Sequence, residues 1–309
     1  MVSNEKILNF LYCFDKNYKM QGYSSIISLL DKIDSKINLL IIYSENHFSD
    51  LPNIIKFHKN LNSLKVFKFK DNHYDFPNLE NNHISIATYY RLFIENYISD
   101  EYETLIYLDA DTICLNNPIE NIYKTINNLR SSNFVIAART EKKQTLSHDD
   151  EVFKRLNLTG KYFNAGVLII NLKKWKEFNF TEQLLQKMNE KRAYIVHWDQ
   201  DVLNAFINGK YLEMEKSLNF NSIDYQNKSE SVDILHFIGS KKPWYLSGIF
   251  YPGSEIYQEN YQKIKNNTYH VVHIWKKSSI KDLLIALITL KVLKLDKPII
   301  FLKSFIKSL

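Results

Sequence analysis

The feature that most constrains the fold is an alternation of two patterns along the chain. Six short apolar runs have the length and composition of buried strands: residues 7–14, 37–43, 64–69, 104–108, 134–138 and 167–171. Apolar residues recur at helical spacing in four other segments: residues 22–33, 51–61, 86–98 and 181–192. Strands that alternate with helices form βαβ units. We therefore expect an α/β fold in which helices flank a mainly parallel central sheet.

The fourth apolar run ends in two carboxylates, Asp109 and Asp111, with only Ala110 between them. On an extended backbone, positions i and i+2 point the same way, so both carboxylates are expected on one face of the strand end. In open α/β sheets, ligands bind beyond the carboxyl ends of the strands. Adjacent carboxylates repel unless a cation lies between them, and oxygen ligands suit Mg²⁺ or Mn²⁺. The motif predicts a divalent metal site for a phosphorylated substrate, with a solvated acidic turn as the alternative.

Two further motifs have the residue types of a sugar-binding site. In the first, Ala165 and Gly166 allow close approach to the backbone, and Asn164 offers an amide to sugar hydroxyls. In the second, Asp199 and Gln200 form a polar cluster. Each has a structural alternative, because the first pattern also suits a turn entering a strand and the second a helix N-terminus.

A third motif follows a short apolar run and contains His236, Gly239 and Lys242. Imidazole is a plausible third ligand for a metal such as Mn²⁺. The glycine permits close backbone approach, and the lysine could contact a phosphate. A single histidine on a strand can also be purely structural.

Composition excludes several classes of protein. With 45% hydrophobic and 14% aromatic residues among 309, the chain is too rich in core-forming residues for disorder. Its two cysteines are too few for a disulfide framework and are expected to be buried thiols. The first residues lack the plan of a signal peptide, and no apolar run is long enough to cross a bilayer. We expect a soluble, cytoplasmic protein.

Charge is concentrated at the C-terminus. Residues 276–309 contain eight lysines and two aspartates, a net charge of +6, which equals that of the whole chain. The remaining residues are neutral, so no basic stripe crosses the folded body and nucleic-acid binding is not expected. Lysines alternate with apolar residues at helical spacing, and Pro298 is expected to separate two short helices. We expect a catalytic domain at 1–265 and, at 266–309, a basic amphipathic tail that attaches to an anionic membrane surface; the alternative is that the tail helices pack on the domain.

The ordered set of motifs resembles the retaining glycosyltransferases of family 8, above all the bacterial galactosyl- and glucosyltransferases of lipopolysaccharide and lipooligosaccharide synthesis. The resemblance covers about residues 6–250. It lies in six blocks: Phe-Asp-Lys-Asn-Tyr at 14–18, Ser-Ile-Ala-Thr-Tyr-Tyr-Arg-Leu at 85–92, Tyr-Leu-Asp-Ala-Asp at 107–111, Tyr-Phe-Asn-Ala-Gly-Val at 162–167, Asp-Gln-Asp at 199–201 and His-Phe-Ile-Gly-Ser-Lys-Lys-Pro-Trp at 236–244.

The resemblance implies a GT-A type, Rossmann-like fold, a UDP-hexose donor and Mn²⁺ (or Mg²⁺) held by Asp109, Asp111 and His236. It implies that Asp15 and Asn17 hold the uridine and that Gly239 and Lys242 hold the diphosphate. The residues expected to contact donor or metal are Asp15, Asn17, Tyr18, Arg91, Asp109, Ala110, Asp111, Asn164, Ala165, Gly166, Asp199, Gln200, His236, Gly239 and Lys242.

The resemblance further implies retention of configuration, although no pair of carboxylates can be assigned as nucleophile and acid. We expect a front-face displacement in which Gln200 and Asp199 stabilise positive charge on the sugar. Where the family commonly has an aspartate soon after the strand ending at Ala138, this chain offers only Glu141. Residues 139–160 have no clean period and are expected to form an irregular loop near the site. The acceptor is expected to be a lipid-linked glycan at the inner face of a bacterial plasma membrane.

Two other functions fit parts of the sequence. A haloacid-dehalogenase-type phosphatase would use Asp109 as nucleophile and Asp111 as acid, although in that family the motif usually lies near the N-terminus. A non-catalytic UDP-sugar-binding protein would retain the fold without transfer. The sequence does not distinguish galactose from glucose as the transferred hexose.

Overall fold

The structure, a computed structural model, describes residues 7–44, 51–70, 74–77, 85–142, 151–225 and 231–309. Its centre is a seven-stranded sheet in the order β3-β2-β1-β4-β7-β6-β8. The strands are β1 (Leu8–Phe14), β2 (Ile37–Tyr43), β3 (Leu61–Lys68), β4 (Thr104–Leu108), β6 (Ile136–Lys142), β7 (Tyr162–Asn171) and β8 (Leu212–Glu213). All pairings in this sheet are parallel except those of β7, which runs antiparallel to β4 and β6. The expected mainly parallel α/β sheet is confirmed.

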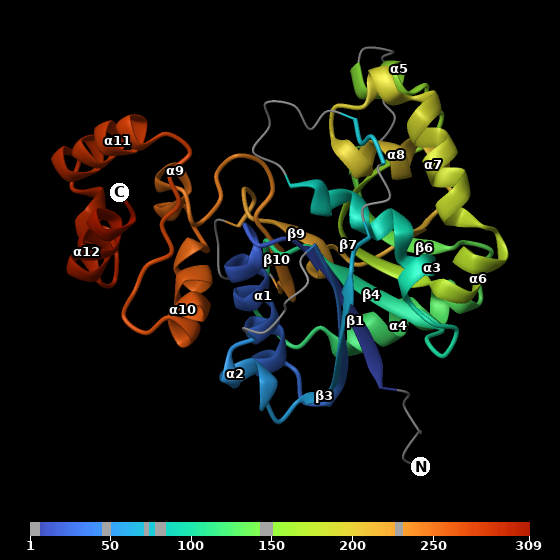
Figure 1. The fold of residues 1–309 in the computed structure, drawn as a ribbon, viewed down its shortest axis with the longest axis horizontal. Helices are drawn as coiled ribbons and strands as arrows, with labels where there is room; N and C mark the ends of the chain where they lie inside the picture. The colour runs from blue at the N-terminus through green and yellow to red at the C-terminus, as the bar shows by residue number, and fades with distance from the viewer. Residues whose placement is uncertain (1–6, 45–50, 71–73, 78–84, 143–150, 226–230) are drawn as a thin grey trace.

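Helices cover both faces of the sheet (Figure 1). Along β1, Phe10, Tyr12 and Phe14 belong to a core shared with α1 (Lys19–Lys32) and α4 (Ile119–Arg130). The alternate residues Leu11 and Cys13 belong to the core on the other face. That core includes residues of the 3-10 helix η1 (Ile86–Phe93), α3 (Ile94–Tyr97), α6 (Leu172–Glu177), α7 (Phe180–Glu190) and α8 (Trp198–Ile207). Because both faces are covered, the central strands are mostly apolar along their length.

Several expected elements have different bounds. The helix expected at 51–61 is wrong: only α2 (Asn53–Lys56) forms, and β3 begins at Leu61. The segment expected to be a single helix at 86–98 is mostly η1, followed by one turn of α-helix. The prediction of an irregular loop at 139–160 is also wrong for both ends of that range. Its first residues belong to β6, which continues to Lys142, and α5 (Glu151–Leu156) forms before β7. Pairing with β7 extends β6 beyond its apolar residues. Residues 143–150 lie outside the described part of the chain.

A three-stranded sheet lies beside the main one, in the order β5 (Thr112–Cys114), β10 (Ile234–His236), β9 (Phe220–Asn221). After α9 (Leu246–Ile249) and α10 (Ser254–Ile264), the chain ends in α11 (Lys276–Ile288), the short 3-10 helix η4 (Lys291–Lys294) and α12 (Pro298–Ser308). Pro298 is the first residue of α12, so the expected break between two tail helices is confirmed. Across the described ranges, no helix is both long and apolar enough to cross a bilayer.

The tail helices share a core with the body of the protein. Phe301 and Phe305 of α12 are fully buried, and they cluster with Ala286 of α11 and with Leu246 and Ile249 of α9. This packing places α11 and α12 at one end of the molecule, beside α9 and α10 (Figure 1). One side of each tail helix is therefore used for folding.

Candidate active site

The topology brings the functional motifs to one edge of the main sheet. Asp15 follows β1 and Asp109 follows β4, and these two strands are parallel neighbours. Because β7 runs the opposite way, its first residues lie at the edge where β4 ends, with Val167 opposite Leu108. Asn164, three residues before Val167, therefore lies at this edge. Helix α8, which begins at Trp198, brings Asp199 and Gln200 to the same place, as their contacts below show.

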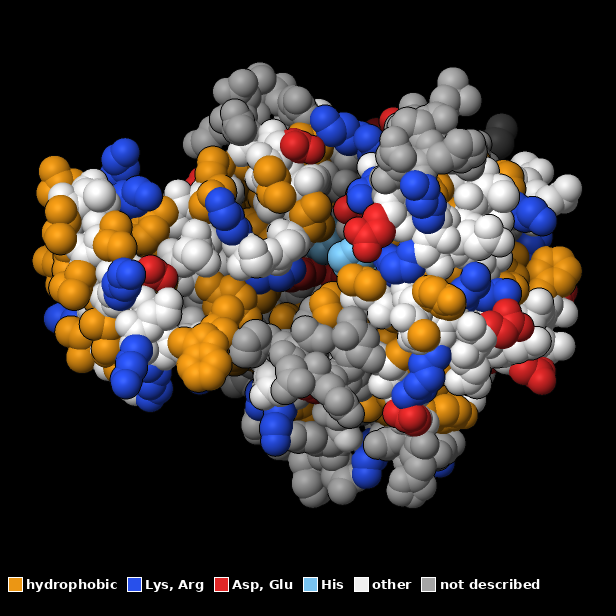
Figure 2. Space-filling view, turned by 90° about the horizontal axis from the view of Figure 1, so that it is seen from above, with side chains coloured by type: hydrophobic (Ala, Val, Ile, Leu, Met, Phe, Trp, Pro, Cys, Tyr) orange, Lys and Arg blue, Asp and Glu red, His pale blue; other side chains and the backbone are white. Residues whose placement is uncertain are grey.

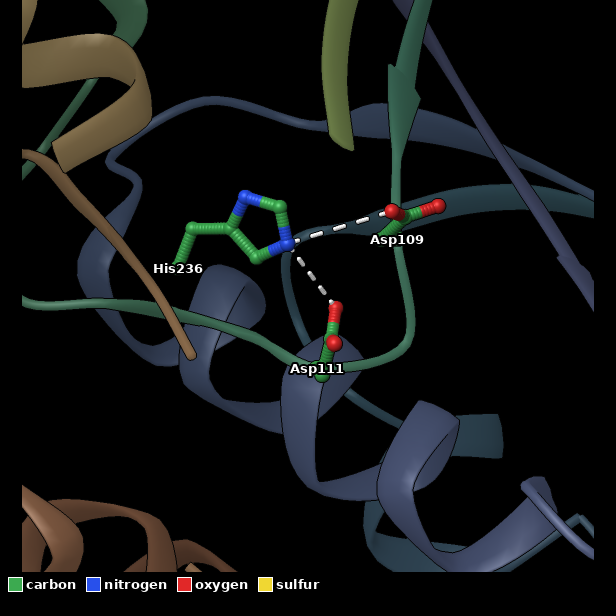
Figure 3. Close-up of side chains that lie close together, drawn as sticks. All are labelled: Asp109, Asp111 and His236. Carbon is green, nitrogen blue, oxygen red and sulfur yellow. Dashed lines mark ion pairs between the residues drawn. The ribbon is translucent and has the colours of Figure 1, made fainter. Parts of the chain in front are cut away.

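Three side chains converge as a candidate metal site (Figure 3). Asp109 and Asp111 lie in a turn between β4 and β5, in which the N–H of Thr112 donates to the carbonyl of Asp109 at 3.2 Å. The extended backbone expected here is therefore wrong. The turn nevertheless directs both carboxylates to His236, whose Nε2 lies 3.9 Å from Asp109 Oδ2 and 3.2 Å from Asp111 Oδ1. The three ligand atoms lie within 4.8 Å of one another.

A neighbouring asparagine determines which ring nitrogen of His236 is the hydrogen-bond donor. Nδ1 of His236 lies 3.0 Å from Oδ1 of Asn219, while Nδ2 of Asn219 donates to Asn164 Oδ1 at 3.0 Å. The Asn219 oxygen can only accept, so Nδ1 is the donor and Nε2 is the nitrogen left to bind a metal. Gly166 leaves room for the ring, because a Cβ there would lie 2.0 Å from His236 Cε1. In this structure, the lack of a side chain at Gly166 is what allows the His236 ring to occupy its position.

This arrangement suits a divalent cation. His236 Nε2 faces Asp111 Oδ1 at 3.2 Å, and that oxygen is buried without a hydrogen-bond donor among the described residues. The carboxylates of Asp109 and Asp111 repel each other, and a cation between them removes the repulsion. Two carboxylates and one imidazole are a ligand set that Mn²⁺ accepts, and Mg²⁺ suits the carboxylates. The residues present therefore fit the metal.

A lysine beside the carboxylates adds positive charge. Lys242 Nζ lies 2.5 Å from Asp111 Oδ2 and donates to the carbonyl of Phe237 at 2.6 Å. Burial acts to raise the pKa of Asp111, but Lys242 and His236 together outweigh it and hold that pKa below its ordinary value. Gly239 lines the same pocket with φ +72°, and apart from its two chain neighbours no described residue has a heavy atom within 4 Å of where its Cβ would be. Lysine and glycine thus lie where a diphosphate next to the metal could be reached.

A buried arginine connects the metal site to α8. Arg91 lies 2.9 Å from Asp109 through Nη2 and 2.6 Å from Asp199 through Nε, and its guanidinium lies over the ring of Tyr107. Asp199 also accepts a hydrogen bond from the hydroxyl of Thr88. Burial raises the pKa of Asp199 to about 6, although Arg91 acts in the opposite direction. Arg91 therefore fixes the relative positions of the β4 end and the α8 start.

The amide of Gln200 is held from three sides. Its Oε1 accepts from the N–H of Ala165 at 3.0 Å, and its Nε2 donates to the Tyr162 hydroxyl at 3.0 Å and to Glu141 Oε2 at 3.2 Å. Asn164 Nδ2 also reaches Glu141 Oε2, at 3.5 Å. Glu141, which lies within β6 and not after it, is thus placed among the residues expected to surround the transferred sugar.

These side chains line a pocket of about 660 Å³, a size that suits a small-molecule ligand. It brings together most of the predicted residues: Tyr18, Arg91, Asp109, Ala110, Asp111, Asn164, Ala165, Asp199, Gln200, His236, Gly239 and Lys242. Asp15, Asn17 and Gly166 are not in this lining. Asp15 instead accepts hydrogen bonds from the Tyr18 N–H and the Ser85 hydroxyl, at the pocket edge.

Three contributing residues were not singled out from the sequence. Thr88 and Tyr162 lie inside the motif blocks, and Thr88 holds Asp199 while Tyr162 holds Gln200. Asn219, which orients His236, lies at the end of the 3-10 helix η3 (Lys216–Asn219) and outside every motif block. No local pattern marks Asn219, because its role depends on a partner 17 residues away in sequence.

Comparisons with known proteins agree with this site. The family described as "Glycosyl transferase family 8" matches residues 9–247. A putative glycosyltransferase of Haemophilus influenzae is 30% identical over 77% of this chain and 73% of its own length. A lipopolysaccharide 1,2-glucosyltransferase of Escherichia coli is 26% identical over 83% of this chain and 78% of its own length.

Among solved structures, the galactosyltransferase LgtC, in complex with donor and acceptor sugar analogues, has a similar fold. Its TM-score is 0.71 at 19% identity, over 88% of this chain and all of that one. The GT-A type fold is confirmed by this likeness. The family match spans all six motif blocks, and the chain therefore belongs to glycosyltransferase family 8.

Proposed function

We propose that this enzyme, a metal-dependent hexosyltransferase, transfers galactose or glucose from a UDP-hexose to a lipopolysaccharide or lipooligosaccharide acceptor, with retention of configuration and with Mn²⁺ as the metal. The observation that carries the proposal is the convergence of Asp109, Asp111 and His236 beside Lys242. The lipopolysaccharide glucosyltransferase among its relatives supports the acceptor class. The phosphatase alternative uses only the two aspartates, and neither it nor the non-catalytic alternative is favoured by the family match.

We expect the uridine and the diphosphate of the donor to bind to different groups of residues. Asp15, Asn17 and Tyr18 would hold the uridine at the β1 end. There Asp15 is already fixed by the Asn17 N–H at 2.9 Å and by Ser85 at 2.7 Å. Asp109, Asp111 and His236 would hold the metal, which as a Lewis acid neutralises charge on the departing diphosphate. Lys242 would contact the same diphosphate through a charge-assisted hydrogen bond, with Gly239 allowing its close approach.

Chemistry at the sugar would depend on Gln200 and Asp199. Gln200 lies among Asn164, Glu141 and Tyr162, and its amide is a poor nucleophile. We therefore infer a front-face displacement in which the leaving phosphate helps to deprotonate the acceptor. The Gln200 carbonyl would stabilise positive charge on the sugar, and Asp199, paired with Arg91, would add negative charge nearby. Glu141 would supply the acidic contact to the transferred hexose.

The tail at 266–309 would attach the enzyme to the inner face of a bacterial plasma membrane, where a lipid-linked acceptor is available. Its eight lysines from residue 276 onward support this proposal, since each lysine near an anionic surface contributes about 1 kcal/mol. Packing of Phe301 and Phe305 against α9 does not oppose attachment, because it uses only the inner side of the tail helices.

The test is donor hydrolysis and transfer by the purified full-length protein. UDP-galactose, UDP-glucose and their N-acetyl forms are compared with Mn²⁺, with Mg²⁺ and with EDTA, and the anomeric configuration of any product is determined. We expect one UDP-hexose to be turned over best with Mn²⁺ and the product to retain its configuration. Full turnover in EDTA, an inverted product, or phosphate release from phosphomonoesters in place of UDP-sugar turnover would contradict the proposal.

A further inference from the structure

Exposed apolar side chains are concentrated in the tail. Across the described residues, 21 large hydrophobic side chains are exposed, and 12 of them lie in residues 274–309, which make up a small part of the chain. Scattered exposed apolar residues are normal, but a concentration of this kind marks an interaction surface. Because the tail core is formed by other residues, such as Phe301 and Val292, the exposed set is not needed for folding.

The chemistry of this surface identifies its partner. Among the exposed apolar residues, Ile288 is 81% exposed and Leu293 is 68% exposed. Leu293 lies between Lys291 and Lys294, and six further lysines lie elsewhere in the tail. Apolar side chains surrounded by lysines fit the boundary between acyl chains and anionic headgroups. A protein partner of matching charge would instead need acidic groups around an apolar centre.

The apolar surface continues to the mouth of the catalytic pocket. Ile274 and Ile223 both line that pocket, yet they are 44% and 54% exposed. Trp275, directly before α11, is 72% exposed. Figure 2 shows that the apolar tail surface and the pocket lie on one face. Hydrophobic side chains gather over the tail helices at the left. That same face is hollowed near its centre, where acidic and histidine side chains are visible.

We propose that the pocket mouth itself faces the lipid bilayer: Ile223, Ile274 and Trp275 (the rim) contact an anionic membrane surface together with the outer side of α11, η4 and α12. This inference rests on the proposed attachment of the tail and adds the orientation of the enzyme on the membrane. An acceptor sugar close to its lipid anchor then enters the pocket without leaving the surface.

Trp275 is a natural reporter for this orientation. Trp175 and Trp244 are buried at 1% exposure, so of the four tryptophans only Trp198 and Trp275 can respond to a surface. The full-length protein is mixed with vesicles of phosphatidylglycerol and phosphatidylcholine in equal parts, with and without brominated acyl chains. We expect the emission to shift to shorter wavelength and to be quenched by the brominated lipid. Both effects should be smaller in Trp275→Phe, and the signal that remains belongs to Trp198, which lines the pocket.

Rim and control variants make the test specific. Ile223→Asp and Ile274→Asp should each weaken vesicle partitioning about tenfold, the cost of not burying one such side chain. Phe178→Asp is the matched control, because Phe178 is 50% exposed at the end of α6, on the opposite side of the molecule from the tail (Figure 1). It should bind vesicles as the unaltered protein does.

The outcomes separate this inference from the proposals on which it rests. If Ile288→Asp with Leu293→Asp abolishes vesicle binding while the rim variants bind normally and Trp275 is not quenched, the tail attaches but the orientation is wrong. A dimer in analytical ultracentrifugation that the rim variants dissociate would mean that a second copy covers this surface, and would also overturn the inference. Hydrolysis of UDP-hexose without vesicles is measured separately, since its failure concerns the proposed reaction alone.

Discussion

Replacing Gly166 with alanine tests whether His236 is a metal ligand. The backbone at Gly166 is extended within β7, so alanine is compatible with it. A Cβ at this position would lie 2.0 Å from His236 Cε1 and 2.7 Å from Nε2, whereas real Cβ contacts are essentially never under 3.0 Å. The imidazole must therefore move by about 1 Å, away from the position set by Asn219.

The expected loss of Mn²⁺ affinity in Gly166→Ala can be estimated from what happens when a metal-binding side chain is displaced. Disturbing the groups that orient a metal ligand typically lowers affinity 10- to 100-fold, or about 1.4 to 2.8 kcal/mol. We expect Gly166→Ala to need correspondingly more Mn²⁺ for half-maximal donor hydrolysis, with activity partly recovered at high Mn²⁺. Binding of Mn²⁺, followed by calorimetry or electron paramagnetic resonance, should weaken by the same factor, while circular dichroism stays unchanged.

A double-mutant cycle supplies the control. In a His236→Ala background there is no ring to displace, so adding Gly166→Ala should cause no further loss of metal affinity. If Gly166→Ala alone leaves the Mn²⁺ dependence unchanged, or if the two substitutions are additive, His236 does not act through the position seen in this structure and the reasoning fails.

Three further predictions concern the same pocket. Asp109→Ala or Asp111→Ala should abolish Mn²⁺-dependent hydrolysis while circular dichroism shows that the fold is intact; activity in either variant would contradict the metal site. The melting temperature in EDTA should fall in both variants, because each loses an ion pair, Asp109 with Arg91 or Asp111 with Lys242. Gln200→Ala should lower kcat by at least tenfold with little change in donor KM, and near-normal turnover would remove it from the mechanism. Burial raises the pKa of Asp199 to about 6 from an ordinary value of 3.8, so the folded state binds a proton that the unfolded chain releases. Its contribution to stability, about 3 kcal/mol, is present below about pH 4 and lost as pH rises to about 6. Asp199→Asn should lack this loss in thermal unfolding followed from pH 4 to 7 in EDTA, and identical pH profiles would contradict it.

The strands and the pair of aspartates at the candidate metal site were predictable because both are local. The run from Leu105 to Leu108 is apolar at every position, and this occurs where helices cover both faces of a sheet. Once that strand is placed, Asp109 and Asp111 must lie at its carboxyl end, whatever the turn that follows. The Pro298 break in the tail is equally local, since proline removes a backbone donor and favours the first turn of a helix.

The errors arose where tertiary contacts override local pattern. Residues 51–61 have helical spacing, but pairing with β2 draws the chain into β3 from Leu61. Residues 139–142 have no strand pattern, yet pairing with β7 and the contact of Glu213 with Arg139 keep them extended. For the tail, apolar residues at helical spacing do not reveal which side packs and which is exposed. That division depends on Leu246 and Ile249 of α9, more than 25 residues earlier in the chain.

By itself, the sequence determined the α/β class and the strand end at which the carboxylates meet, because residue type and spacing carry that information. Its family resemblance pointed to Asp109, Asp111 and His236 as the candidate metal ligands. Only the tertiary structure decided how those side chains are oriented. The antiparallel direction of β7 brings Asn164 to the edge where Asp109 lies, and Asn219 fixes the proton on His236. These contacts join segments far apart in sequence, and a hydrogen bond depends on the positions of its atoms in space, which no local pattern encodes.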